Sequence, residues 1–243
     1  MDNLIDIHNH IIYGVDDGSE NLAQSQNMLK IAYGEGIRKM ILTPHHNPYR
    51  WQVDPAVLHE RFDQLKEYAG NNFPGMELYL GSEIYYGNDT LQELGDGWIT
   101  TMAHSNYVLV EFSPYTEYDV ISRAVMGIQQ NGFYPIIAHV ERYECIVEDP
   151  ECVDMLKDYG AFIQINASSV VKDYGRAVRK FIKGVLKKQQ VDFVATDAHG
   201  DEHRAPVIAK CAQHIKKHFG EAYAYRIMRD NPASVIAGTY IED

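Results

Sequence analysis

The chain has 243 residues, of which 45% are hydrophobic and 23% charged, as in an ordinary globular protein and unlike a disordered or fibrous one. Its 22 basic and 34 acidic residues give a formal net charge of −12. This charge argues against nucleic acid as the main partner, because phosphate backbones are bound by clustered lysine and arginine. No run approaches the roughly 18 apolar residues of a membrane span, so we expect no membrane insertion.

Short apolar runs rich in β-branched and aromatic residues recur along the chain. They predict seven strands, at residues 4–8, 39–43, 77–81, 107–112, 134–139, 161–166 and 191–196. Polar segments with helical spacing lie between them, at residues 21–34, 55–70, 117–131, 151–159, 173–189 and 204–219, with a weak connector near 89–94.

The alternation of strand and helix predicts an α/β fold with parallel pairing, in a single domain over residues 1–243. The even spacing favours a TIM-like (β/α)7 barrel over an open doubly wound sheet. With seven strands instead of eight, we expect this barrel to be distorted or incompletely closed.

Histidine and acidic residues follow the predicted strands. In chain order they are His8, His10, His45, Glu83, Glu111, His139, Asp197 and His199. The carboxyl ends of the strands of a parallel barrel lie on one face, so we expect these side chains to converge on one pocket. Five of the 11 histidines occupy such strand ends.

His8 and His10 are two residues apart, as are Asp197 and His199. Residues i and i+2 of a strand point to the same side, so each pair can grip one ion. A lone histidine is more often a hydrogen-bonded core or surface residue. We assign the histidines away from strand ends to such surface roles, except His46, which adjoins the predicted site.

The segment VDDGS contains Asp16 and Asp17 in good turn chemistry, with Ser19 placed to cap the following helix. A turn role is sufficient for Asp16. For Asp17, nearness to His8 and His10 is the only support from the residues themselves.

Imidazole and carboxylate ligands without thiolate suit manganese, iron or zinc. The set is large enough for two or three ions with one bridging carboxylate. Four carboxylates against three divalent ions leave a charge of about +2, which attracts a phosphate dianion, whereas two ions leave about zero. Such centres activate a bridging hydroxide and stabilise the entering and leaving oxygens of displacement at phosphorus.

Two arginines lie close after predicted ligands. Arg142 follows His139 by three residues, and Arg204 follows His199 by five. Guanidinium groups bind phosphoryl oxygens in a bidentate fork, so both are candidates for a phosphate clamp, with surface salt bridges as the alternative.

Other catalytic designs are missing from the sequence. Cys145, Cys152 and Cys211 begin no Cys-x5-Arg loop, and no Walker loop or Gly-x-Ser-x-Gly elbow occurs. The three cysteines form neither a disulfide framework nor a Cys-x-x-Cys metal motif. With no signal peptide apparent, we expect a reducing, cytoplasmic location.

The segments DIHNHIIYGVDDGS, LTPHH, GSEIYY, VEFS, IAHVERY and TDAHG are specific in combination. They resemble the PHP (polymerase and histidinol phosphatase) superfamily, and more closely the manganese-dependent tyrosine phosphatases of bacterial capsule and exopolysaccharide operons. The resemblance runs from residue 2 to about residue 238. It implies a distorted (β/α)7 barrel with a three-metal site at its carboxyl face.

By motif match, the resemblance implies three ligand sets that share Glu83 as a bridge. They are His8, His10, Glu83 and Asp197; Glu83, Glu111 and His139; and Asp17, His45 and His199. The match selects Asp17 over Asp16 and implies phosphate contacts by Arg142 and Arg204. One departure concerns substrate contacts: relatives often carry a basic pair after His45, whereas here residues 46–49, HNPY, precede Arg50.

The resemblance implies a protein tyrosine phosphatase that acts by attack of a metal-bound hydroxide. Its expected substrate is the tail of a bacterial tyrosine kinase, and its expected effect is on capsular or exopolysaccharide synthesis. Arg142 and Arg204 would orient the phosphoryl group, and His199 or His46 would protonate poorer leaving groups.

Two alternatives to a tyrosine phosphatase are open. One is a small-molecule phosphatase of the histidinol-phosphatase type, and the other is a non-catalytic metal-binding regulator. A nuclease is disfavoured by the charge of −12 and by the lack of a basic stripe. The sequence leaves the oligomeric state open.

Overall fold

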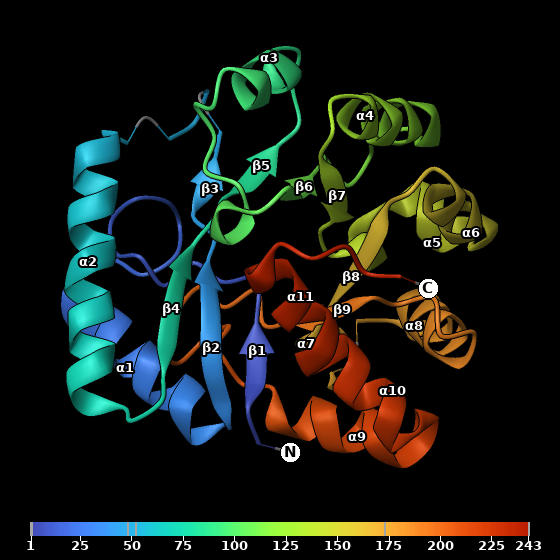
Figure 1. The fold of residues 1–243 in the computed structure, drawn as a ribbon. Coiled ribbons are helices and arrows are strands. Elements are labelled where there is room, and N and C mark those ends of the chain that lie inside the picture. Colours follow the sequence, from blue (N-terminus) through green and yellow to red (C-terminus); the bar gives the residue numbers. More distant parts are fainter. Residues whose placement is uncertain (1, 48, 52, 173, 243) are drawn as a thin grey trace.

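The computed structural model describes residues 2–47, 49–51, 53–172 and 174–242 (Figure 1). The strands are β1 (Leu4–Asp6), β2 (Ile37–Leu42), β3 (His45–His46), β4 (Glu77–Leu80), β5 (Glu83–Tyr85), β6 (Tyr107–Glu111), β7 (Tyr134–Ile137), β8 (Phe162–Asn166) and β9 (Phe193–Ala195). The helices are α1 (Leu22–Gly34), α2 (Pro55–Asn72), α3 (Thr90–Gly95), α4 (Tyr118–Gln130), α5 (Glu144–Glu148), α6 (Glu151–Asp158), α7 (Ala167–Val171), α8 (Arg176–Lys187), α9 (Ala209–Phe219), α10 (Glu221–Tyr225) and α11 (Asn231–Ala237).

The seven predicted strands are confirmed, with small differences at their ends. The six predicted helices are confirmed as α1, α2, α4, α6, α8 and α9, and the weak connector is α3. Asp173, at the start of one predicted helix, lies outside the described residues. Helices α5, α7, α10 and α11 were not predicted, because helices of five to seven residues are too short to show a periodic apolar face.

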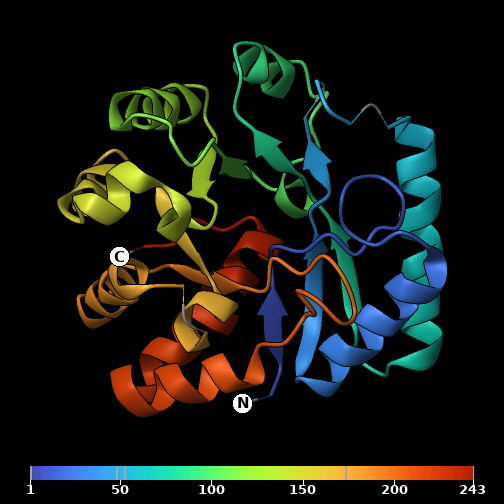
Figure 2. The ribbon, with the colours of Figure 1, turned by 180° about the vertical axis from the view of Figure 1, so that it is seen from behind.

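All strand pairs are parallel and fall into two hydrogen-bonded sets, β1-β2-β4 and β3-β5-β6-β7-β8-β9. Helices surround the curled sheet on its outside, as the two opposite views show (Figures 1 and 2). The fold is therefore a mixed α/β fold with a curled parallel sheet that forms a half-barrel.

The sheet divides where β3 continues β2 and β5 continues β4. Pro44, between β2 and β3, has no backbone N–H to donate to a neighbouring strand. At Gly81, between β4 and β5, an added Cβ would lie 2.9 Å from Ile41 and 3.1 Å from Met102. The strand pairing is interrupted at both points, and the segments that carry His45 and Glu83 join the second set.

The first and last strands meet mainly through side-chain and loop contacts. The Thr196 hydroxyl and backbone N–H donate to the two oxygens of the buried Asp6 carboxylate, at 2.6 and 2.9 Å. Beyond the strands, Asp197 N–H donates to the His8 carbonyl, and an isolated parallel bridge joins Asn9 to Ala198. These contacts bring residues from the two ends of the chain to one place.

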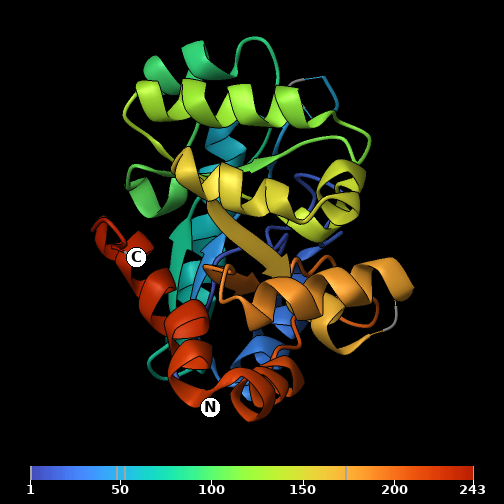
Figure 3. The ribbon, with the colours of Figure 1, turned by 90° about the vertical axis from the view of Figure 1, so that its right-hand side faces the viewer.

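Two buried clusters stabilise the fold. The larger lies between the sheet and its outer helices. The smaller gathers alternate residues from strands around the inside of the curl: Ile5, Ile41, Leu109, Ile136, Phe162 and Phe193. Val235 of α11 belongs to this inner cluster, and Figure 3 shows the C-terminal helices beside the amino ends of the strands.

The functional site lies directly beyond the inner cluster, toward the carboxyl ends of the strands. On β6, Glu111 follows Leu109 by two residues, and on β8, Gln164 follows Phe162 by two residues. Ala195 is followed in the same way by Asp197. Because side chains alternate along a strand, an apolar layer is followed on the same face by a polar one. No helix in the described ranges is long and apolar enough to cross a membrane.

Candidate metal centre

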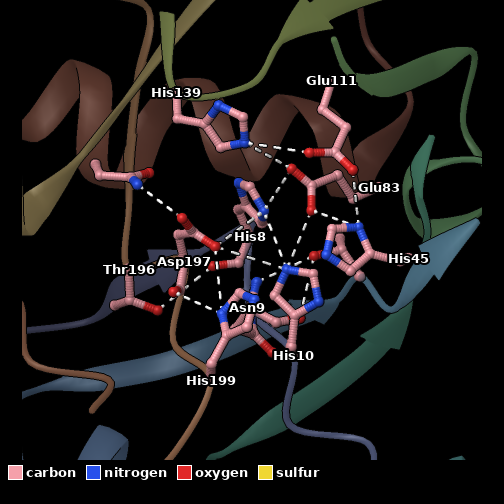
Figure 4. Close-up of polar contacts among 12 residues, drawn as sticks. His8, Asn9, His10, His45, Glu83, Glu111, His139, Thr196, Asp197 and His199 are labelled. Carbon is pink, nitrogen blue, oxygen red and sulfur yellow. Dashed lines mark hydrogen bonds and ion pairs between the residues drawn. The ribbon is translucent and has the colours of Figure 1, made fainter. Parts of the chain in front are cut away.

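The histidine and acidic residues that follow the strands converge in one pocket (Figure 4). Glu83 lies at its centre: Oε1 is 3.1 Å from His8 Nε2 and 2.9 Å from His139 Nε2. Its Oε2 is 3.1 Å from His10 Nε2 and 3.2 Å from His45 Nδ1. A single buried carboxylate thus contacts four imidazoles from three different strand ends.

The remaining acidic side chains surround this centre. Asp197 Oδ1 lies 3.6 Å from Nε2 of both His8 and His10. Glu111 Oε1 lies 3.0 Å from His45 Nδ1. Asp17, nearly half exposed, has Oδ1 3.4 Å from His45 Nε2 and 3.7 Å from His199 Nε2.

The donor atoms form three groups whose members lie within 4.8 Å of one another. They are His10, Asp17, His45 and His199; His8, His10 and Asp197; and His45, Glu83 and Glu111. All nine ligands implied by the resemblance lie in or beside this cluster, since His139 contacts Glu83 directly. The grouping differs in detail from the implied sets: His10 and His45 each fall into two groups.

The donor set fits cations better than it fits hydrogen bonding alone. His8 Nε2 and His10 Nε2 lie 3.3 Å apart, and Nδ1 of each ring already faces a protein oxygen. In the neutral rings that donate from Nδ1, both Nε2 atoms carry lone pairs that a cation can bind. The buried His45 Nδ1 is close to two carboxylates yet has no hydrogen-bond partner among the described residues. Ligands that share an ion rather than a proton have this arrangement.

Three of the imidazoles are held from behind by a protein oxygen at Nδ1. His10 Nδ1 is 2.8 Å from Asp16 Oδ2, His8 Nδ1 is 3.1 Å from Gln164 Oε1, and His199 Nδ1 is 3.0 Å from the Asp197 carbonyl. Such contacts fix the tautomer and leave Nε2 free to bind a metal. In each ring, Nε2 faces the cluster.

Gln164 on β8 holds two ligands at once. Its Oε1 accepts from the His139 backbone N–H at 2.8 Å, which fixes the orientation of the carboxamide because a backbone N–H can only donate. Nδ1–H of His8 therefore donates to the same oxygen. The Gln164 amide donates to Asn166 Oδ1 at 3.0 Å, and Asn166 donates to Asp197 Oδ2 at 2.8 Å. One buried chain of amides thus connects His8, His139 and Asp197.

Asp16 has a larger role than the turn predicted for it. Its side chain is fully buried, and besides His10 it accepts from the backbone N–H of His45 at 3.0 Å and of Gly18 at 2.9 Å. Asp16 therefore positions two ligand-bearing segments, while Asp17 faces the pocket. Neither Asp16 nor Gln164 was predicted in this role, and only the unusual polarity of Gln164 within an apolar strand signals it.

The charge of the cluster shifts the pKa of its members. Burial opposes protonation of His10, yet Asp16 and Glu83 raise its pKa to about 9. Burial also opposes protonation of His139, and Glu111 and Glu83 raise its pKa to about 9. For His45, burial is again outweighed by Asp17 and Glu111, and the pKa is about 11. The carboxylates thus draw positive charge into the pocket.

The pKa values of Glu83 and His199 are lowered instead of raised. Burial disfavours the charged form of Glu83, but the surrounding imidazoles hold its pKa well below its usual range. Burial and the positive charges of His10 and Arg204 lower the pKa of His199 to about 3. With this pKa His199 is neutral at pH 7, the form in which an imidazole can bind a metal. Its role as a proton donor stays a prediction.

Arg142 and Arg204 stand on the rim and converge on one carboxylate. Arg142 Nη2 lies 2.5 Å from Asp197 Oδ2, and Arg204 Nη2 lies 2.8 Å from Asp197 Oδ1. Both side chains are about two-fifths exposed, at 42% and 43%, so their guanidinium groups also reach the solvent side of the pocket. Both arginines thus form ion pairs with Asp197 and also line the pocket, and their role as a phosphate clamp stays a prediction.

Ligands at two strand ends adopt a left-handed backbone. His139 has φ 34° and Asp197 has φ 50°, values that non-glycine residues rarely adopt and that cost of order 1–3 kcal/mol each. This backbone turns each side chain out of the strand and into the cluster.

The segment after His45 forms one wall of the pocket. Trp51 stacks on the His45 ring at a centroid distance of 4.7 Å and an interplanar angle of 6°. The guanidinium carbon of Arg50 lies 4.3 Å from the centroid of the Trp51 ring. Asn47 also lines the cavity, whereas His46 pairs with Glu93 at 3.1 Å, outside the ligand groups. Pro48 lies outside the described residues. Trp51 and Asn47 were not predicted as site residues.

A family model described as "Capsular polysaccharide synthesis, CpsB/CapC" matches residues 4–237 of this chain. The chain belongs to the CpsB/CapC family. It is 30% identical over 243 residues to the tyrosine-protein phosphatase CpsB of Streptococcus agalactiae serotype V, which covers 98% of this chain and all of that protein. It is 32% identical over 238 residues to CpsB of Streptococcus pneumoniae, with 96% and 98% covered.

One solved structure similar to this CpsB/CapC member belongs to a pair, YwqE of Bacillus subtilis and CpsB of Streptococcus pneumoniae, described as unique metal-dependent tyrosine phosphatases. It superposes with a TM-score of 0.90 at 29% identity and covers 98% of this chain and 96% of that one. The predicted family resemblance is thereby confirmed.

Replacing Gln164 by methionine is expected to weaken metal binding about 10- to 100-fold, because His8 and His139 lose the acceptor that orients them. Gln164→Glu keeps the acceptor oxygens and should lose less. Competition with a chromophoric chelator measures the affinity. Gln129→Met, which removes an amide bonded to the Gly160 carbonyl, is the control. Unchanged affinity in Gln164→Met would show that the amide chain does not position the ligands.

Metal binding is expected to release protons. At about pH 7.5 the raised pKa values of His10, His139 and His45 keep these rings protonated in the metal-free protein, and an ion must displace those protons. Affinity should therefore rise with pH, steeply up to about 9 and more weakly up to about 11, where His45 loses its proton. Calorimetric titration with Mn²⁺ in buffers of different ionisation enthalpy measures the release. Heats that are independent of the buffer would contradict this prediction.

Proposed function

We propose that this chain is a metal-dependent protein tyrosine phosphatase. The observation that carries the proposal is the convergence of five imidazoles and four carboxylates beneath two rim arginines, in a member of the CpsB/CapC family. The names of its relatives support phosphotyrosine as the substrate class. We further propose that residues 1–243 form one domain and that the curled sheet is an incompletely closed (β/α)7 barrel.

The site would hold two or three divalent ions, manganese first, with iron or zinc as alternatives. His8, His10, Glu83 and Asp197 would hold one; Glu83, Glu111 and His139 a second; and Asp17, His45 and His199 a third. The contacts of Glu83 with four imidazoles support its role as the bridge. When bound, such ions supply an activated water and neutralise phosphoryl oxygens.

The chain's own side chains would bind and orient the substrate. Arg142 and Arg204 present guanidinium groups at the rim, where a bidentate fork can hold the phosphoryl oxygens. Trp51, Tyr85 and Phe112 line the same cavity of about 280 Å³ and offer apolar surface to an aromatic ring. A phenolate is a fairly good leaving group, so the reaction does not need a strong proton donor.

The physiological substrate would be the tyrosine-rich tail of a bacterial tyrosine kinase, and the consequence would be control of capsular or exopolysaccharide synthesis. The family description, capsular polysaccharide synthesis, supports this context. The rim arginines and the aromatic lining favour an enzyme over a non-catalytic metal-binding regulator.

The test is hydrolysis by protein stripped of metal and then supplied with Mn²⁺, Zn²⁺ or Fe²⁺. We expect activity on p-nitrophenyl phosphate and on a phosphotyrosine peptide to vanish on chelation and to return with at least one ion. The peptide should be preferred to histidinol phosphate. A preference of more than about a hundredfold, roughly 2.7 kcal/mol, for histidinol phosphate would overturn the substrate class. Full activity in the stripped protein would overturn metal dependence.

A further inference from the structure

Positive charge is concentrated in one segment of this acidic protein. Residues 172–188 contain seven of the 22 basic residues of the chain, against a single acidic one. The basic residues are Lys172, Arg176, Arg179, Lys180, Lys183, Lys187 and Lys188. The sequence-based conclusion that the chain lacks a basic stripe is therefore wrong for α8 and the residues before it.

Part of this charge lines a groove between α7, α8 and α9. The groove has a volume of about 740 Å³, and Lys172, Lys183 and Lys187 stand along it. None of these three lysines has an ion-pair partner among the residues that the structure describes. Their ammonium groups thus remain available to a negatively charged ligand.

The floor of the groove is apolar. Val170 and Val171 come from α7, Ile182 and Leu186 from α8, and Phe219 from α9. Val171 is 45% exposed, so part of this apolar surface is open to solvent. The groove therefore offers contacts to aliphatic side chains between its cationic edges. This combination suits a peptide with alternating acidic and apolar residues.

A third cavity between the groove and the metal pocket shares lining residues with both. This cavity has a volume of about 330 Å³ and shares Lys172 with the groove. At its other end it shares Arg142, Arg204 and Asp197 with the metal pocket. Asp197 is the only carboxylate among the described residues that line either the groove or this connecting cavity.

Local structure explains these shared residues. Helix α7 begins directly after Asn166, whose side chain bonds Asp197, and ends one residue before Lys172. The chain that leaves strand β8 at the metal centre thus forms the near wall of the groove. Figure 2 shows α8 and α9 close together on one side of the molecule.

We infer that the groove binds an acidic segment of the substrate, next to the phosphotyrosine that enters the metal pocket. This inference rests on the proposed function and adds a second point of recognition to it. The lysines favour acidic residues of the segment, and the apolar floor favours aliphatic ones. The connecting cavity places the bound segment next to the phosphotyrosine in the metal pocket. Nucleic acid and anionic membranes would use the charge but not the apolar floor.

The test compares two double variants of α8 with equal change in net charge. Lys183→Glu/Lys187→Glu reverses two residues of the groove, whereas Arg176→Glu/Lys180→Glu reverses two residues of the same helix that do not line it. Three substrates are used: a phosphotyrosine peptide flanked by alternating Glu and Leu, one flanked by Gly and Ser, and p-nitrophenyl phosphate.

We expect wild-type kcat/KM for the acidic peptide to exceed that for the Gly-Ser peptide about tenfold, through KM. The groove variant should lose this advantage, while the control variant keeps it within about twofold. Turnover of p-nitrophenyl phosphate should be the same in all three proteins. Equal losses in both variants, or no preference in the wild type, would overturn the inference.

A binding measurement separates this inference from the proposed function. Fluorescence anisotropy of the unphosphorylated Glu-Leu peptide needs no catalysis and should show binding that is lost only in the groove variant. If this binding is seen but no variant hydrolyses p-nitrophenyl phosphate, the proposed function fails while the groove stands as a peptide site. Groove-dependent binding of oligo(U) or of phosphatidylglycerol vesicles, without binding of the peptide, would contradict the inference.

Discussion

The repulsion among buried, like-charged groups is the constraint on which the rest of the structure depends. Four carboxylates are held with five imidazoles in one pocket, and Glu83 in its centre is 1% exposed. Burying such charge costs several kcal/mol per group unless opposite charge is close. In the metal-free protein, protonated imidazoles and two arginines supply that positive charge. In the metal-bound protein, divalent cations would supply two charges per ion. The fold must therefore keep these carboxylates close together although their negative charges repel one another.

The curled sheet supplies the necessary rigidity. An inner apolar layer, which includes Leu109, Ile136 and Phe162, lies directly below the polar layer on the same strands. Because this floor is close-packed, the strand ends above it have little freedom, and hydrogen bonds from Asp16 and Gln164 fix the rings that project from them. The left-handed backbone at His139 and Asp197 is energetically unfavourable, and the packed strands around these residues hold it in place.

The sequence predicted the strands and the ligands because both depend on local patterns. Apolar runs revealed the seven strands, and parallel topology then placed residues as distant as His8 and Asp197 together. Asp16 and Gln164 were missed because their role depends on which ring they face, and that is a tertiary property. The split of the sheet at Pro44 and Gly81 was missed for the same reason.

The groove beside α8 was missed for a different reason: the net charge of a chain does not show where its charges lie. The net charge of −12 hid a local concentration of seven basic residues. Only the packing of α7 against α8 and α9 shows that four of them line one cavity. Whole-chain charge describes long-range attraction, whereas recognition depends on where the charges stand.

The most direct test of the account is a crystal structure of the protein grown with Mn²⁺, with diffraction recorded on both sides of the manganese absorption edge. We expect two or three anomalous peaks within about 2.5 Å of the nine donor side chains, with Glu83 next to more than one of them. Absence of any peak in this pocket, with manganese bound elsewhere or nowhere, would contradict it.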